Sequence, residues 1–128
     1  MRLLDLIRHL RVRAQTGAPG CAITVLFDDG LVWVRRRDFD VVGMQVRFSW
    51  ESIRRVCFKD NGPFASDLIH VFVAGHAKAI TIPLEAEGGG EFWRALRDRK
   101  ILPGDFHERA TLATDGGLYC WPPLVRES

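Results

Sequence analysis

The sequence predicts an α+β fold, in which a strongly bent antiparallel sheet or partly open β-barrel carries a C-terminal capping helix and a short N-terminal helix. Three observations predict this fold. Short segments of alternating apolar and polar residues follow one another closely, turn-forming residues separate them, and an amphipathic helical segment follows the last of them. The 128 residues suffice for one ordinary domain but not for two, so we expect residues 1–128 to form a single domain.

The elements can be assigned in order along the chain. Residues 2–14 predict a short helix, because apolar residues recur there at spacings of three and four. The breaker-rich stretch 16–20 ends it, and a series of strands follows, separated by turn signals such as Asp28-Asp29-Gly30. Alternation is clearest in the third strand, where every second residue from Val42 to Phe48 is apolar. The expected strands are residues 21–27, 31–37, 41–48, 54–59, 67–74 and 78–83.

A second helix and a C-terminal extension complete the chain. The helix is expected at about residues 91–100, with its large apolar side chains toward the interior. In the extension, residues 101–128, we expect a small hairpin of 110–114 with 117–121 around an Asp-Gly turn. The pattern assigns no role to the following segment, Trp121-Pro122-Pro123.

Part of the chain resembles a known family. The stretch Trp50–Val56, a tryptophan followed by an isoleucine and a valine that lead into a strand, is similar to the middle of bacterial pleckstrin-homology-like (PH-like) domains. Residues 80–83, followed by a helix containing Phe92-Trp93, resemble the end of those domains. The resemblance spans about residues 21–100 and implies the fold. It does not carry over lipid-headgroup binding, because Asp28 and Asp29 stand where some eukaryotic members have basic residues.

The cysteines and the N-terminus suggest a compartment. Cys21, Cys57 and Cys120 are too few and too scattered for a disulfide framework, and their odd number favours a reducing environment. The chain has no run of about 18 apolar residues, and charged side chains interrupt its N-terminal apolar residues before a signal peptide could form. We therefore expect a cytoplasmic protein.

Catalytic and metal-binding patterns are weak. The histidines and cysteines lack the spacing of zinc ligands, so we expect no metal site, and no motif suggests a cofactor. Cys57 lies between apolar residues and is interpreted as a packing residue. The best general acid–base pair is His107 with Glu108 in an expected loop, which solvated surface residues explain equally well.

The strongest binding candidate is a basic and aromatic sheet face. If residues 42–48 point their apolar side chains inward, the pairing of the second and third strands turns one tryptophan and its cationic neighbours outward. The same alternation in the fourth strand adds two further cations. The expected face consists of Trp33, Arg35, Arg37, Arg47, Arg55 and Lys59. The alternative is that Trp33 packs beneath the termini and the arginines only solvate the sheet.

These features favour a non-enzymatic binding module that recognises an acidic patch on another protein, such as an accessory or immunity-type protein. Residues 1–59 hold eleven Arg and Lys against six acids, whereas residues 60–128 hold seven against ten. We do not expect nucleic acid as the partner. The first alternative is a PH-like domain that binds a membrane surface through its N-terminal helix, and the second is a small enzyme. The expected membrane-binding residues are Arg2, Leu6, Arg8, Arg11 and Arg13.

Overall fold

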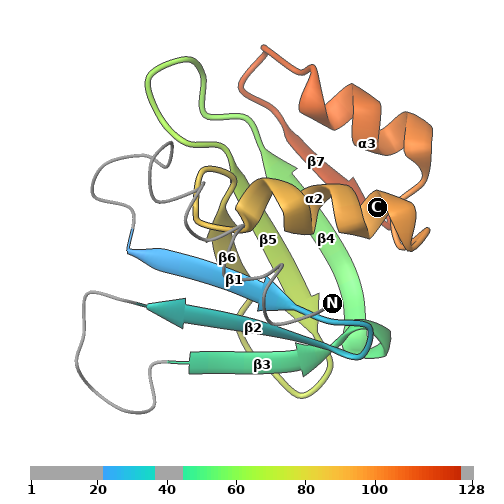
Figure 1. Cartoon of the computed structure of the whole chain (residues 1–128). Helices are drawn as coiled ribbons and strands as arrows, with labels where there is room; N and C mark the ends of the chain where they lie inside the picture. Colours follow the sequence, from blue (N-terminus) through green and yellow to red (C-terminus); the bar gives the residue numbers. More distant parts are fainter. Residues whose placement is uncertain (1–21, 37–44, 125–128) are drawn as a thin grey trace.

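The computed structural model describes residues 22–36 and 45–124, which form two antiparallel sheets and two α-helices (Figure 1). The first sheet has the order β1-β2-β3. Its strands are β1 (Ile23–Phe27), β2 (Leu31–Arg36) and β3 (Gln45–Ser49). A short 3-10 turn at Trp50–Ser52 carries the chain from this sheet to the second one.

The second sheet has four strands in the order β6-β5-β4-β7. These are β4 (Ile53–Lys59), β5 (Leu68–Val73), β6 (Ile80–Pro83) and β7 (Leu118–Trp121). In Figure 1 the strands of the two sheets cross, with the first sheet in front. The described strands therefore form a two-layered arrangement and not a closed barrel.

Two helices lie along one side of these sheets (Figure 1). Helix α2 (Gly89–Asp98) buries Phe92, Trp93 and Leu96, which helical periodicity places on one side of it. Helix α3 (Gly104–Thr111) follows after a short connection and packs beside β7.

One cluster of buried side chains joins both sheets to both helices. Phe92 of α2 lies at its centre, where its ring contacts Phe27, Phe48 and Trp50 at centroid distances of 6.4, 6.5 and 5.7 Å. The Trp50 indole also donates a hydrogen bond of 2.8 Å to the carbonyl oxygen of Asp28, so its one polar group is satisfied. Helix α2 thus packs against both sheets, through Phe48 of β3 and Phe58 of β4.

Most of the expected elements are confirmed. The six strands and the helix lie within about three residues of their predicted limits where the structure describes them. Part of the third strand and the N-terminal helix at 2–14 lie outside the described residues.

The predicted hairpin of 110–114 with 117–121 is wrong. Residues 110 and 111 belong to α3, which buries Phe106, His107 and Ala110 on one helical face. A strand does form at residues 118–121, but it pairs with β4 and not with residues 110–114. The Asp-Gly signal is local, whereas the pairing joins segments about 60 residues apart in sequence.

The cysteine prediction is also wrong, because Cys57 and Cys120 form a disulfide across 63 positions. The pairing of β4 with β7 places these two residues directly opposite each other. Cys57 is a packing residue as well, with only 2% of its surface exposed. The inference of a reducing compartment from the odd cysteine count therefore loses its basis.

Candidate functional site

The outer face of the first sheet brings together three of the six residues predicted for the binding face. Trp33 of β2 pairs directly with Arg47 of β3, and Arg35 lies two residues further along β2. Val32 and Val34, which flank Trp33 in the sequence, are buried in the core. The predicted alternation is confirmed, so Trp33, Arg35 and Arg47 define what we call the first-sheet face.

The register of β2 and β3, in contrast, is shifted by two residues from the one that a three-residue loop at residues 38–40 would give. A three-residue loop would place Trp33 opposite Gln45, whereas Trp33 lies opposite Arg47. The described part of β2 ends at Arg36, and β3 begins at Gln45. A shift by an even number of residues keeps every side chain on its face, which explains why the faces were still predicted correctly.

The sequence left two alternatives for Trp33, an exposed ring on the binding face or a ring buried beneath the termini, and its environment lies between them. Its side chain is half-buried, neither enclosed like Val32 nor fully exposed. In the sheet it lies between Leu26 of β1 and Arg47 of β3. Arg35 and Arg47 are exposed, and within the described residues neither forms an ion pair with a carboxylate. Their charges therefore face solvent beside an amphipathic ring.

The remaining predicted site residues are not part of this face. Arg55 and Lys59 lie on β4 in the second sheet, where they donate hydrogen bonds to the backbone oxygens of Pro122, at 3.0 Å, and Gly116. Alternation indicates the side of a strand on which a residue lies but not the sheet to which the strand belongs. Arg37 and the expected membrane-binding residues Arg2, Leu6, Arg8, Arg11 and Arg13 lie outside the described residues.

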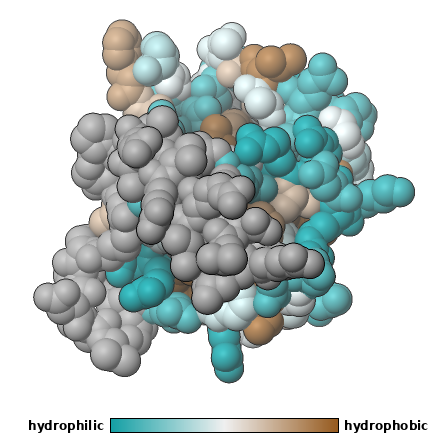
Figure 2. Space-filling model, in the orientation of Figure 1, coloured by the Kyte–Doolittle hydropathy of each residue, from teal (hydrophilic) through white to brown (hydrophobic). Residues whose placement is uncertain are grey.

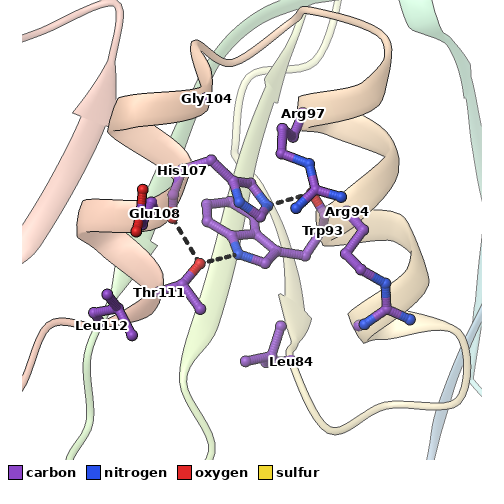
Figure 3. Close-up of a pocket in the computed structure, with 10 residues that line it drawn as sticks. Leu84, Trp93, Arg94, Arg97, Gly104, His107, Glu108, Thr111 and Leu112 are labelled. Atoms are coloured by element: carbon purple, nitrogen blue, oxygen red, sulfur yellow. Dashed lines mark hydrogen bonds between the residues drawn. The ribbon is translucent and has the colours of Figure 1, made fainter.

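A second candidate region, which the sequence did not predict, is a groove between α2 and α3 (Figure 3). This interhelical groove has a volume of about 490 Å³. Trp93, Arg94 and Arg97 line it from α2, and His107, Glu108 and Thr111 from α3. The helical spacing of Phe106, His107 and Ala110 was the available signal for α3, but the Asp-Gly turn signal at residues 115–116 favoured a hairpin.

A hydrogen-bonded network holds the two walls together. Trp93 donates from its indole Nε1 to Thr111 Oγ1 at 2.8 Å, and the Thr111 hydroxyl donates to the carbonyl oxygen of His107 at 2.6 Å. The imidazole stacks on Trp93 with ring centroids 4.4 Å apart. His107 Nε2 lies 2.8 Å from the carbonyl oxygen of Trp93. Because a carbonyl can only accept, Nε2 carries the proton and donates it there.

The same network argues against an acid–base role for His107 and Glu108. His107 lies in a helix and not in a loop, and burial lowers the pKa of its imidazole. Its Nε2–H is committed to the Trp93 carbonyl, while Glu108 is exposed on the surface. While this hydrogen bond is intact, the Nε2–H of His107 is not available to a reacting atom.

Other catalytic arrangements are not evident in the described part of the chain. No group of three or more His, Cys, Asp or Glu side chains there could hold a metal ion. Cys57 and Cys120 are bonded to each other and cannot serve as thiolate nucleophiles. The helices within 22–36 and 45–124 are too short or too polar to cross a lipid bilayer.

Comparisons with family models, curated proteins and solved structures found no match to this chain. Function must therefore be argued from the two surfaces themselves.

Proposed function

We propose that this protein is a non-enzymatic binding module with a PH-like fold that recognises an acidic patch on another protein through the first-sheet face. One observation carries the proposal: two exposed arginines, Arg35 and Arg47, flank the half-buried Trp33 on a sheet whose other side is core. Tryptophan and arginine are the side chains most enriched among residues that dominate binding energy at protein interfaces.

The chemistry of the three side chains explains the choice of partner. A guanidinium forms paired hydrogen bonds with a carboxylate, and an exposed indole edge buries apolar surface without a large loss of conformational freedom. The half-buried state of Trp33 supports this role, because a ring already held by the sheet loses little further entropy on binding. An accessory or immunity-type protein is the class we favour.

The test compares three variants in affinity capture from native lysate. Trp33→Ala and Arg47→Glu should both lose the partner, because one removes the anchor and the other reverses the charge beside it. Arg54→Glu is the matched control, since Arg54 is exposed on β4 in the second sheet. The captured proteins are identified by mass spectrometry, and the partner should remain bound to the control.

Two outcomes would contradict the proposal. If Trp33→Ala lowers the free energy of unfolding by about 3 kcal/mol or more, the ring is a core residue and not an interface anchor. Salt-sensitive sedimentation of the wild-type protein with phosphatidylserine vesicles, without any captured protein, would favour membrane binding instead.

A further inference from the structure

The interhelical groove has the size and lining of a site for a small ligand. Its volume of about 490 Å³ falls within the range of about 300–1,000 Å³ that is typical of small-molecule sites. Leu84, Trp93 and Leu112 give it an apolar side. Gly90 and Gly104 line it as well, and an added Cβ at Gly104 would meet no atom within 4 Å. The groove is therefore open at this point and not filled by a neighbouring side chain.

Trp93 forms the buried floor of the apolar side, and Leu112 forms its exposed edge. Trp93 is only 3% exposed and is fixed by its bond to Thr111 and its stacking on His107. Leu112, at the end of α3, lines the groove and is 69% exposed, so its apolar surface is available to a ligand. In Figure 3, Leu84 and Leu112 lie on one side of Trp93, and Arg97 lies on the other. A bound apolar group would cover Leu112 and extend over the floor.

The charged side presents two guanidinium groups. Arg94 and Arg97 line the groove from α2, against a single carboxylate, that of Glu108. The arginine side chains are 52% and 43% exposed, and each forms an ion pair of 3.1 Å, Arg94 with Glu91 and Arg97 with Asp98. Pairs in which the guanidinium stays exposed contribute little to stability, and a guanidinium has donors left for a second acceptor. Both arginines can therefore bind an additional anion.

From this arrangement we infer that the interhelical groove binds a small amphiphilic monocarboxylate, a molecule with one carboxylate and a short apolar chain. The carboxylate pairs with Arg94 and Arg97, and the chain lies against Trp93, Leu84 and Leu112. Glu91 and Asp98 already pair with the two guanidinium groups, and Glu108 also lines the groove, so a ligand with a single negative charge meets the least repulsion. A phosphate group, with close to two negative charges, would meet stronger repulsion from Glu108. This site shares no residue with the first-sheet face, so a negative result at one site does not contradict the proposal for the other.

The test follows the Trp93 indole N–H by ¹H–¹⁵N NMR, with its resonance identified from its loss in Trp93→Phe. Octanoate is the probe, and octan-1-ol and octylammonium are controls with the same chain but no charge or the opposite charge. Octanoate should shift the Trp93 resonance saturably, with an affinity about tenfold or more above either control, as expected for one charge-assisted contact. Absence of a saturable shift, or equal affinity for the three probes, would overturn the inference.

Surface variants then locate the two halves of the site. Arg94→Gln with Arg97→Gln should weaken octanoate binding about tenfold while leaving octan-1-ol binding unchanged, because only the charge contact is lost. Leu112→Ser should weaken both probes. Arg54→Gln on β4 should bind octanoate like the wild type. These residues are exposed, and unchanged resonances of the other tryptophans will verify folding. Wild-type affinity in the double arginine variant would also contradict the inference.

Discussion

The imidazole of His107 is 4% exposed and lies between the stacked Trp93 ring and the helix to which it belongs. Burial lowers the pKa of this imidazole, because the charged form would lose its hydration. In the unfolded chain a histidine titrates near its ordinary pKa of about 6.5. As the pH falls below that value, the unfolded state therefore binds a proton that the native state excludes, and the native state loses relative stability.

The wild-type protein should accordingly be less stable at about pH 5.5 than at about pH 7.5, and His107→Gln should reduce this difference. The glutamine amide does not titrate and can still donate a hydrogen bond to the Trp93 carbonyl. Urea unfolding at the two pH values measures the effect. His76→Gln is the control, because His76 is exposed in the turn after β5. An identical pH dependence in wild type and His107→Gln would refute this assignment.

Residue environments of this kind were only partly predictable. The alternation of β2 correctly indicated that Val32 and Val34 face inward and Trp33 outward, because period-two alternation is a property of one strand. The helical burial of His107 was not predicted, since its neighbours Gly104 and Asp105 also suit a turn. A single polar residue carries little information about whether a network will enclose it.

At the scale of elements, the start of α2 is positioned by a close approach to β1. Gly88 precedes the helix with φ of 78°, a left-handed conformation that favours glycine. The backbone N–H of Val25 donates to the carbonyl oxygen of Glu87 at 2.7 Å, which holds the segment against the strand. A Cβ at position 88 would lie 2.1 Å from the carbonyl oxygen of Val25. Figure 1 shows this connection passing beside β1.

Gly88→Ala should therefore destabilise the protein much more than Gly62→Ala. Both glycines have φ of 78°, but a Cβ at Gly62 meets nothing within 4 Å. The left-handed strain, about 1–2 kcal/mol, is common to both variants. The clash at Gly88 adds about 1–3 kcal/mol or more, because backbone must move to relieve it. Denaturant unfolding of the two variants gives the comparison, and equal losses would show that the approach of α2 to β1 is not tight.

The groove is likewise a product of two elements. Residues on α2 were expected to form a helix, and that prediction is confirmed, but α3 was assigned to a strand and a loop. The pattern of α2 alone does not distinguish Arg94 and Arg97 from other exposed residues of a helix. Arg94 and Arg97 line one groove because α3 lies across from α2.

At the scale of the whole molecule, the exposed large apolar side chains of residues 22–36 and 45–124 are scattered. On the face shown in Figure 2, hydrophobic residues form separate patches among hydrophilic ones. Phe64, which is fully exposed, and Leu118, which is 51% exposed, belong to a loop and an edge strand. This distribution favours recognition by a few anchored side chains over a broad apolar interface.

The disulfide stabilises the whole chain and not one element. The bond closes a loop across the 63 positions between Cys57 and Cys120. This loop limits the conformations of the unfolded state and should raise its free energy by about 4 kcal/mol. Replacing both residues by alanine should therefore lower the free energy of unfolding by roughly that amount. Reductant should destabilise the wild-type protein similarly and leave the double variant unchanged. Wild-type stability that does not respond to reductant would show that the bond is absent in solution.

Local patterns in the sequence were sufficient to predict the six strands from β1 to β6, the helix α2 and the inward faces of β2, β3 and β4. Period-two and period-3.6 burial arise from the geometry of a single segment, so neighbouring residues encode them. The pairing of β7 with β4, the Cys57–Cys120 bond and the groove against α3 depend on segments distant in sequence. Which segments meet is set by packing of the complete core around Phe92, and no local pattern contains that information.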